Sequence, residues 1–223
     1  MKPATRALVL LVSVACALGG TAPSGSAATR TGRANEPYVS LRHPQEVHGT
    51  KGREVLEVFW YGCRHSQLLE APLEEWAARQ PADVVLRRLP AVWPGTSDQT
   101  VERAHARLYY TLDRLGEVDR LQRAVFDAVV AQGRDLTSEA TAADWAETQG
   151  VDRGRFTQAY ESAQVRGEVD QAPSELARYE VDELPSVVVQ GRYRTSPTKA
   201  GGVDAIPGAL DRMLGQVRSS RTA

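Results

Sequence analysis

The fold of this chain is decided by residues 54–66, which have the sequence EVLEVFWYGCRHS. The surrounding segment 53–61 is rich in valine, leucine and aromatic residues and predicts a buried β-strand. The next segment, 63–79, carries large apolar side chains at helical spacing and predicts an α-helix, with a kink at Pro72. Cys63 is therefore expected where a buried strand passes into a helix.

The predicted position of Cys63 favours the thiolate form of its side chain. Unpaired backbone N–H groups and the helix dipole stabilise negative charge at a helix N-terminus. Arg64 and His65 add positive charge or hydrogen-bond donors in the same turn. Because the thiolate is the nucleophile in disulfide exchange, Cys63 is the candidate catalytic residue.

A second informative stretch, residues 184–193, reads LPSVVVQGRY. Its valines predict a strand after Pro185, and residues 190–191 predict the turn of a hairpin. A core strand is expected over 84–89, several helical patterns occupy about 97–165, and a final helix follows the hairpin. This order predicts an α/β fold with one mixed sheet and a helical insertion.

Together, the two stretches resemble the DsbA family, bacterial oxidoreductases that insert disulfides into exported proteins. The family's active-site motif is Cys-Pro-His-Cys. This chain keeps Cys63 and His65, but has Arg64 and Ser66 at the other two positions, so its motif is Cys-x-x-Ser. The resemblance covers about residues 38–217 and implies a thioredoxin-like sheet with an inserted helical domain.

The resemblance also implies a surface for binding clients beside the cysteine. Leu184 and Pro185 correspond to a family loop that carries a cis-proline, so we expect a cis Pro185 close to Cys63. Trp60 and Tyr61 are further candidates for this surface, and core packing is the alternative role for both rings.

Glu57 corresponds to an acidic residue buried under the DsbA active site. Arg87 or Arg88, on the neighbouring strand, is its expected partner, and an ordinary charge at a strand edge is the alternative. Pro173 lies in the helix expected before the cis-proline and predicts a kink or a restart there.

Ser66 is the most consequential departure from the family pattern. The second cysteine normally resolves the mixed disulfide, and a serine hydroxyl cannot do so. We therefore expect thiol-disulfide exchange through Cys63 alone, as an isomerase, reductase or deglutathionylase. Glutathione or another small thiol is the expected resolving partner, and no other cofactor is predicted.

Three other interpretations stay open at this point. The chain could bind thiol-bearing clients without net redox chemistry. It could be a glutathione-dependent enzyme like the kappa-class transferases, which are similar to DsbA in fold, but an export signal argues against this. It could also carry a decayed site. Turnover with a small thiol separates the enzymatic reading from the binding one.

The N-terminus predicts export to the periplasm or secretion. Residues 1–28 have a basic start, an apolar segment and a small-residue cleavage site, as in a signal peptide. A leader over 29–37 and a tail over 218–223 are expected to be loose. Lipidation of Cys16 is a minor alternative. Without Cys16, Cys63 is the only thiol, which is typical of a reactive cysteine or an intermolecular pair.

The remaining composition argues against other classes of site and partner. The formal net charge of −1 gives no support for nucleic-acid binding. His43, His48 and His105 are isolated and lack the spacing of metal ligands, so no metal site is predicted. After the signal peptide, no segment is apolar enough to cross a membrane. Exported proteins with thiols or disulfides are the expected partners.

Overall fold

The computed structural model describes residues 36–47 and 52–219. The predicted signal peptide, Cys16, His48 and most of the predicted leader lie outside these residues. Within the described chain, no helix is long and apolar enough to span a membrane.

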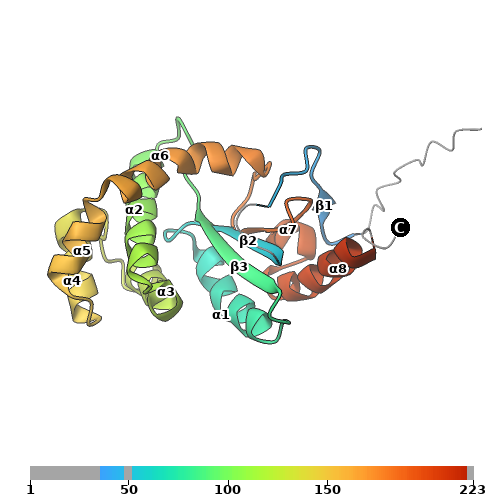
Figure 1. Ribbon diagram of the computed structural model, residues 1–223, viewed down its shortest axis with the longest axis horizontal. Coiled ribbons are helices and arrows are strands. Elements are labelled where there is room, and N and C mark those ends of the chain that lie inside the picture. Colours follow the sequence, from blue (N-terminus) through green and yellow to red (C-terminus); the bar gives the residue numbers. More distant parts are fainter. Residues whose placement is uncertain (1–35, 48–51, 220–223) are drawn as a thin grey trace, which may run out of the picture. The chain divides into compact units, whose positions relative to one another are not determined.

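The centre of the fold is a five-stranded sheet with the strand order β1-β5-β4-β2-β3 (Figure 1). β2 runs parallel to β3 and antiparallel to β4, and β5 is antiparallel to β4 and β1. The sheet is therefore mixed, as predicted. Its strands are β1 (Val39–Ser40), β2 (Arg53–Phe59), β3 (Val84–Pro90), β4 (Ser186–Val189) and β5 (Tyr193–Thr195).

The helices follow the predicted order. They are α1 (Arg64–Ala78), α2 (Gln99–Leu115), α3 (Val118–Phe126), a π-helical turn (Asp127–Ala131), α4 (Glu139–Thr148), α5 (Arg153–Tyr160), α6 (Ala163–Arg178), α7 (Pro197–Ala200), a 3-10 turn (Val203–Ala205) and α8 (Ile206–Ser219). Gly116 ends α2 in a left-handed conformation with φ 72°, which glycine adopts without a steric penalty. The helices α2 to α5 form the predicted insertion between β3 and α6.

Side-chain alternation along β2 gives the sheet two buried faces. Val55 packs with α1 and α8 on one face. Leu56 and Val58 point to the opposite face, where they pack with Leu176 of α6. Both faces of the central strand are thus covered by helices, which explains its nearly continuous apolar sequence.

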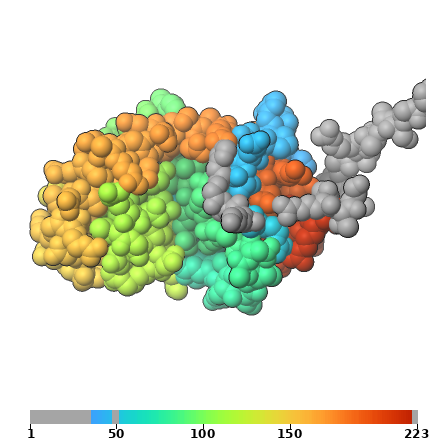
Figure 2. All heavy atoms as spheres, in the orientation of Figure 1, coloured from blue at the N-terminus to red at the C-terminus, as the bar shows by residue number. Residues whose placement is uncertain are grey.

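The insertion has a core of its own that continues into the end of β2. Phe59 packs edge-to-face on Tyr61, Tyr109 and Phe126, with ring centroids 5.0 to 5.8 Å apart. Figure 2 shows the atoms of α5 and α6, in yellow to orange, lying directly against those of α2 in green. The insertion is therefore packed onto the segment that leads to Cys63.

Two expectations need correction, and a third is narrowed. α6 continues through Pro173, which excludes the restart and leaves the kink as the prediction, since the residues on both sides remain helical. Pro37 is part of the fold rather than of a loose leader, because its carbonyl accepts a 2.6 Å hydrogen bond from Thr195. α8 continues to Ser219, so residues 218 and 219 are helical rather than part of a loose tail.

Candidate functional site

Cys63 lies at the junction between β2 and α1, where the sequence predicts it. It is the N-cap residue of α1, with an extended backbone, and its N–H donates to the carbonyl of Trp60 at 2.9 Å. The side chain is partly exposed. A client disulfide can therefore reach the sulfur at the end of the helix where negative charge is stabilised.

The Leu184–Pro185 peptide bond is cis, and it lies beside the cysteine as predicted. The Cys63 thiol is 3.9 Å from the carbonyl oxygen of Leu184, to which it can donate. Pro185 is buried and Leu184 is partly exposed. Ser186 Oγ donates to the carbonyl of Glu183 at 2.7 Å and holds the start of this loop. The two most informative stretches of the sequence thus meet at one place in the fold.

Trp60 borders this place. A Cβ atom added at Gly62 would lie 2.5 Å from the Trp60 ring, so only glycine lets the ring pack so closely against the backbone next to Cys63. The ring is partly exposed, and its centroid lies 6.1 Å from that of His105 on α2. Trp60 therefore stays a candidate contact for a client.

Tyr61 does not belong to the client-binding surface, and that interpretation is wrong. Its side chain is fully buried, and its hydroxyl donates to Gln122 Oε1 at 2.7 Å. The physical reason is alternation, since Tyr61 continues the same side of the chain as Phe59 and packs with it inside the insertion. Core packing, the alternative role for this ring, is the one it has.

The three residues after Cys63 divide between solvent and interior. Arg64 and His65 are exposed, whereas Ser66 is fully buried. Ser66 shares the inner face of α1 with Leu69 and Glu70, because residues three and four positions apart lie on one side of a helix. The Ser66 hydroxyl has no hydrogen-bond partner among the described residues.

Glu57 is not an edge charge but a member of a buried ionic cluster, and its partner is Arg88. Arg88 Nε donates to Glu57 Oε2 at 3.1 Å, and Arg88 also pairs with Glu70. All three side chains are at least nine-tenths buried. Arg87 points to the other face of the sheet and pairs with Glu54 at 2.8 Å.

The cluster has two buried carboxyl groups and one guanidinium. Burial raises the pKa of Glu57 to about 7, although the neighbouring Arg88 opposes the shift. Burial and the nearby Glu57 carboxylate raise the pKa of Glu70 well above its usual range. Because two buried carboxyl groups share one guanidinium, the favoured state near neutral pH keeps a proton on one of them.

Sequence reasoning missed Glu70. The available signal is that it stands among apolar residues on the inner stripe of α1, one turn after Ser66 and next to Leu69. A carboxylate on a buried face needs a buried cation, and Arg88 of β3 supplies it.

The histidines do not form a metal site with other side chains of the described chain, where no group of three or more ligating residues occurs. His43 lies in the loop after β1. His105 is buried, and burial lowers its pKa to about 4. It therefore stays neutral at physiological pH and packs against Trp60 and Tyr61.

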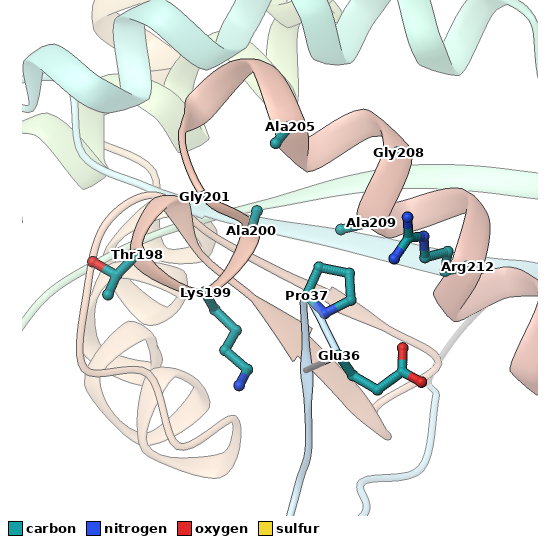
Figure 3. A pocket seen from close by; sticks show the side chains of 10 residues that line it. All are labelled: Glu36, Pro37, Thr198, Lys199, Ala200, Gly201, Ala205, Gly208, Ala209 and Arg212. Carbon is teal, nitrogen blue, oxygen red and sulfur yellow. The ribbon is translucent and has the colours of Figure 1, made fainter. Parts of the chain in front are cut away.

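A surface pocket of about 470 Å³ lies elsewhere, between the start of the described chain and the helices α7 and α8 (Figure 3). Small side chains such as Ala205 and Ala209 line it, and Lys199 and Arg212 stand at its sides. None of its lining residues belongs to the Cys63 site, so this pocket is separate from the candidate chemistry.

Comparisons with known proteins agree with the geometry. The family model of the DSBA-like thioredoxin domain matches residues 54–212. The chain is 32% identical over 222 residues to the thiol:disulfide interchange protein DsbA of Burkholderia cepacia, and the match covers 99% of this chain and all of that protein. A DsbA of Pseudomonas syringae pv. tomato is 31% identical over 214 residues, covering 96% and 98% of the two chains.

Solved structures show the same likeness. The crystal structure of Pseudomonas aeruginosa DsbA matches with a TM-score of 0.76 at 31% identity, covering 84% of this chain and 95% of that one. The Neisseria meningitidis oxidoreductase NmDsbA1 matches with a TM-score of 0.72 at 26% identity, covering 84% and 95%. This chain therefore belongs to the DsbA family of thioredoxin-like proteins.

Proposed function

We propose that this protein catalyses thiol-disulfide exchange through Cys63 alone, as a reductase, isomerase or deglutathionylase. The observation that carries the proposal is the meeting of a partly exposed Cys63, the N-terminus of α1 and the cis Pro185 loop. Ser66 provides no second thiol. The site can form a mixed disulfide with a client but cannot store an oxidising disulfide between positions 63 and 66.

The proposed reaction starts with attack of the Cys63 thiolate on a client disulfide. A bond forms between Cys63 Sγ and one client sulfur, and the other client sulfur leaves with the electron pair. The mixed disulfide is then resolved by a thiol from outside the site. Either a second client thiol attacks, giving isomerisation, or a small thiol such as glutathione attacks, giving reduction.

We further propose that the chain works after export, in the periplasm or outside the cell, on proteins with thiols or disulfides. Support comes from the signal-peptide pattern of residues 1–28 and from membership of the DsbA family. Lipid attachment through Cys16 stays the minor alternative.

Turnover on a client with scrambled disulfides tests the proposal. With glutathione present, we expect many client molecules to be processed per protein molecule. Without it, we expect a one-to-one adduct that later addition of glutathione releases. The matched Cys63→Ser variant should form neither adduct nor product.

Two results count against catalysis by this route. An adduct that glutathione cannot release would support the second candidate function, binding of thiol-bearing clients without turnover, which the missing resolving thiol also allows. Oxidation of a reduced dithiol client beyond one equivalent by the wild-type protein would contradict the single-cysteine mechanism itself.

A further inference from the structure

We propose that Arg64 is an anion subsite of the Cys63 centre, which holds the carboxylate of a small thiol bound to Cys63 in a mixed disulfide. The proposal rests on the function proposed above and adds the chemical class of the resolving thiol. It assigns Gln67 and Asp127 as positioning residues that act through Arg64.

The Arg64 side chain is tethered to the helical insertion. Its Nη1 donates to Gln67 Oε1, and Gln67 Nε2 in turn donates to Asp127 Oδ1 at 2.9 Å. Asp127 opens the π-helical turn of the insertion, a kind of turn that is frequent at functional sites. The guanidinium is thus held beside the first turn of α1 although it is exposed to solvent.

The tether positions Arg64 without neutralising it. The Gln67 amide stands between Arg64 and the Asp127 carboxylate, and Arg64 has no ion pair with any described residue. Within the described chain, the contact with Gln67 engages one of its five N–H donors and leaves the others to solvent or a ligand. The buried Arg88 is the opposite case, because its guanidinium forms ion pairs with Glu57 and Glu70. An exposed, unpaired guanidinium fork matches a carboxylate.

The ligand follows from the neighbouring residue. Arg64 directly follows Cys63 as the first residue of α1, and the exposed His65 adds a further donor on the same turn. Small thiols that carry carboxylates, glutathione among them, can place an anionic group there. Thiols with a cationic group are repelled from the same position.

The step is an ordinary exchange. The small thiolate attacks Cys63 Sγ in the client adduct, a new S–S bond forms, and the client sulfur leaves with the electron pair and takes up a proton. A second small thiolate then attacks the first one's sulfur and releases the Cys63 thiolate. Two small thiols become one disulfide, and the client disulfide is reduced.

The test uses a defined adduct of Cys63 with 2-thiopyridine, made from 2,2′-dithiodipyridine and the protein without residues 1–28, in which Cys63 is the only thiol. Stopped-flow absorbance follows release of the pyridinethione by four thiols: 3-mercaptopropionate and glutathione (anionic), 2-mercaptoethanol (neutral) and cysteamine (cationic). For each thiol the wild-type rate is divided by the variant rate, so that the thiol's own ionisation cancels.

For Arg64→Gln, we expect this ratio to be about two- to fivefold higher for the anionic thiols than for 2-mercaptoethanol, as for an exposed charge pair, and lower for cysteamine. Gln67→Glu should have the same effect, because a carboxylate against Arg64 neutralises it. Added salt should reduce the differences between the thiols in these ratios, because it screens the charge of Arg64 in the wild-type protein.

Two comparisons separate positioning from general damage. Asp127→Ala removes the acceptor for Gln67 and should weaken the preference for anionic thiols, whereas the conservative Asp127→Asn keeps an oxygen that can accept from Gln67 and should keep that preference. Arg212→Gln removes an exposed charge outside the site and should leave all four ratios near one.

Equal ratios for all four thiols in the Arg64→Gln variant would overturn the subsite. That result differs from failure of the proposed function, which would appear earlier as failure of Cys63 to form the thiopyridine adduct at all.

Discussion

The outer and inner sides of the first two turns of α1 differ in whether their charged side chains are paired. On the outer side, Arg64 keeps an unpaired charge in solvent beside Cys63. On the inner side, the buried Arg88 pairs with both Glu70 and Glu57. Water screens the outer charge and leaves it available to a ligand, whereas burial forces the inner charges to pair with each other. One helix thereby separates the proposed anion subsite from structural support.

The largest expected effect comes from removing the inner cation. Arg88→Met leaves two buried carboxyl groups without a positive partner, and we expect a loss of about 3–5 kcal/mol in the free energy of unfolding. Urea unfolding measures it. The matched variant Arg103→Met removes a partner of the exposed Asp170 and should change stability by at most about 0.5–1 kcal/mol. Equal losses of unfolding free energy in the two variants would contradict the contrast between buried and exposed charges.

The inner side should also make stability depend on pH. Because the pKa of Glu57 is raised to about 7 in the folded protein, the folded state binds more protons than the unfolded state above the carboxyl group's ordinary pKa. Stability should therefore fall as pH rises from about 4.5 to 7, by on the order of 2–3 kcal/mol.

Urea unfolding at several pH values checks this slope. The Glu57→Gln variant keeps an acceptor for Arg88 but removes one of the two titrating carboxyl groups of the cluster, so its slope should be flatter. A wild-type stability that rises over the same pH range would contradict the buried-carboxyl account.

Ser66→Cys tests whether the inner face retains the geometry of the family. The substitution exchanges a buried hydroxyl for a thiol of slightly larger size, which should cost no more than about 1 kcal/mol. After mild oxidation, we expect a disulfide between positions 63 and 66, detected as loss of both free thiols in a monomer. Two thiols that stay free, or pair only between molecules, would show that the local geometry differs.

The smallest effect is expected for Ser66→Ala. The hydroxyl is fully buried and has no partner among the described residues, so its removal should leave stability unchanged or raise it by at most about 1 kcal/mol. Thermal unfolding measures the change. A loss well above 1 kcal/mol would reveal a hydrogen bond to Ser66 in solution.

Much of the fold and part of the site can be predicted from the chain alone. The periodicity of 63–79 predicts α1 within one residue at each end, with Cys63 at its start. The resemblance to the family predicts the Leu184–Pro185 loop beside Cys63, and the cis bond and the 3.9 Å approach agree. The cysteine count and the identity of residue 66 are the sequence basis of the proposed single-cysteine mechanism.

Tertiary structure decides which side chains meet across elements. Periodicity tells which face of an element is buried, but the partner of that face comes from distant parts of the chain. Thus Tyr61 belongs to the core, Arg88 rather than Arg87 faces Glu57, and Glu70 joins them from α1. The contact of Gln67 with Asp127 likewise requires the insertion to pack against α1. Local sequence determines the elements and identifies the candidate reactive atom, whereas long-range packing determines the charges that surround it.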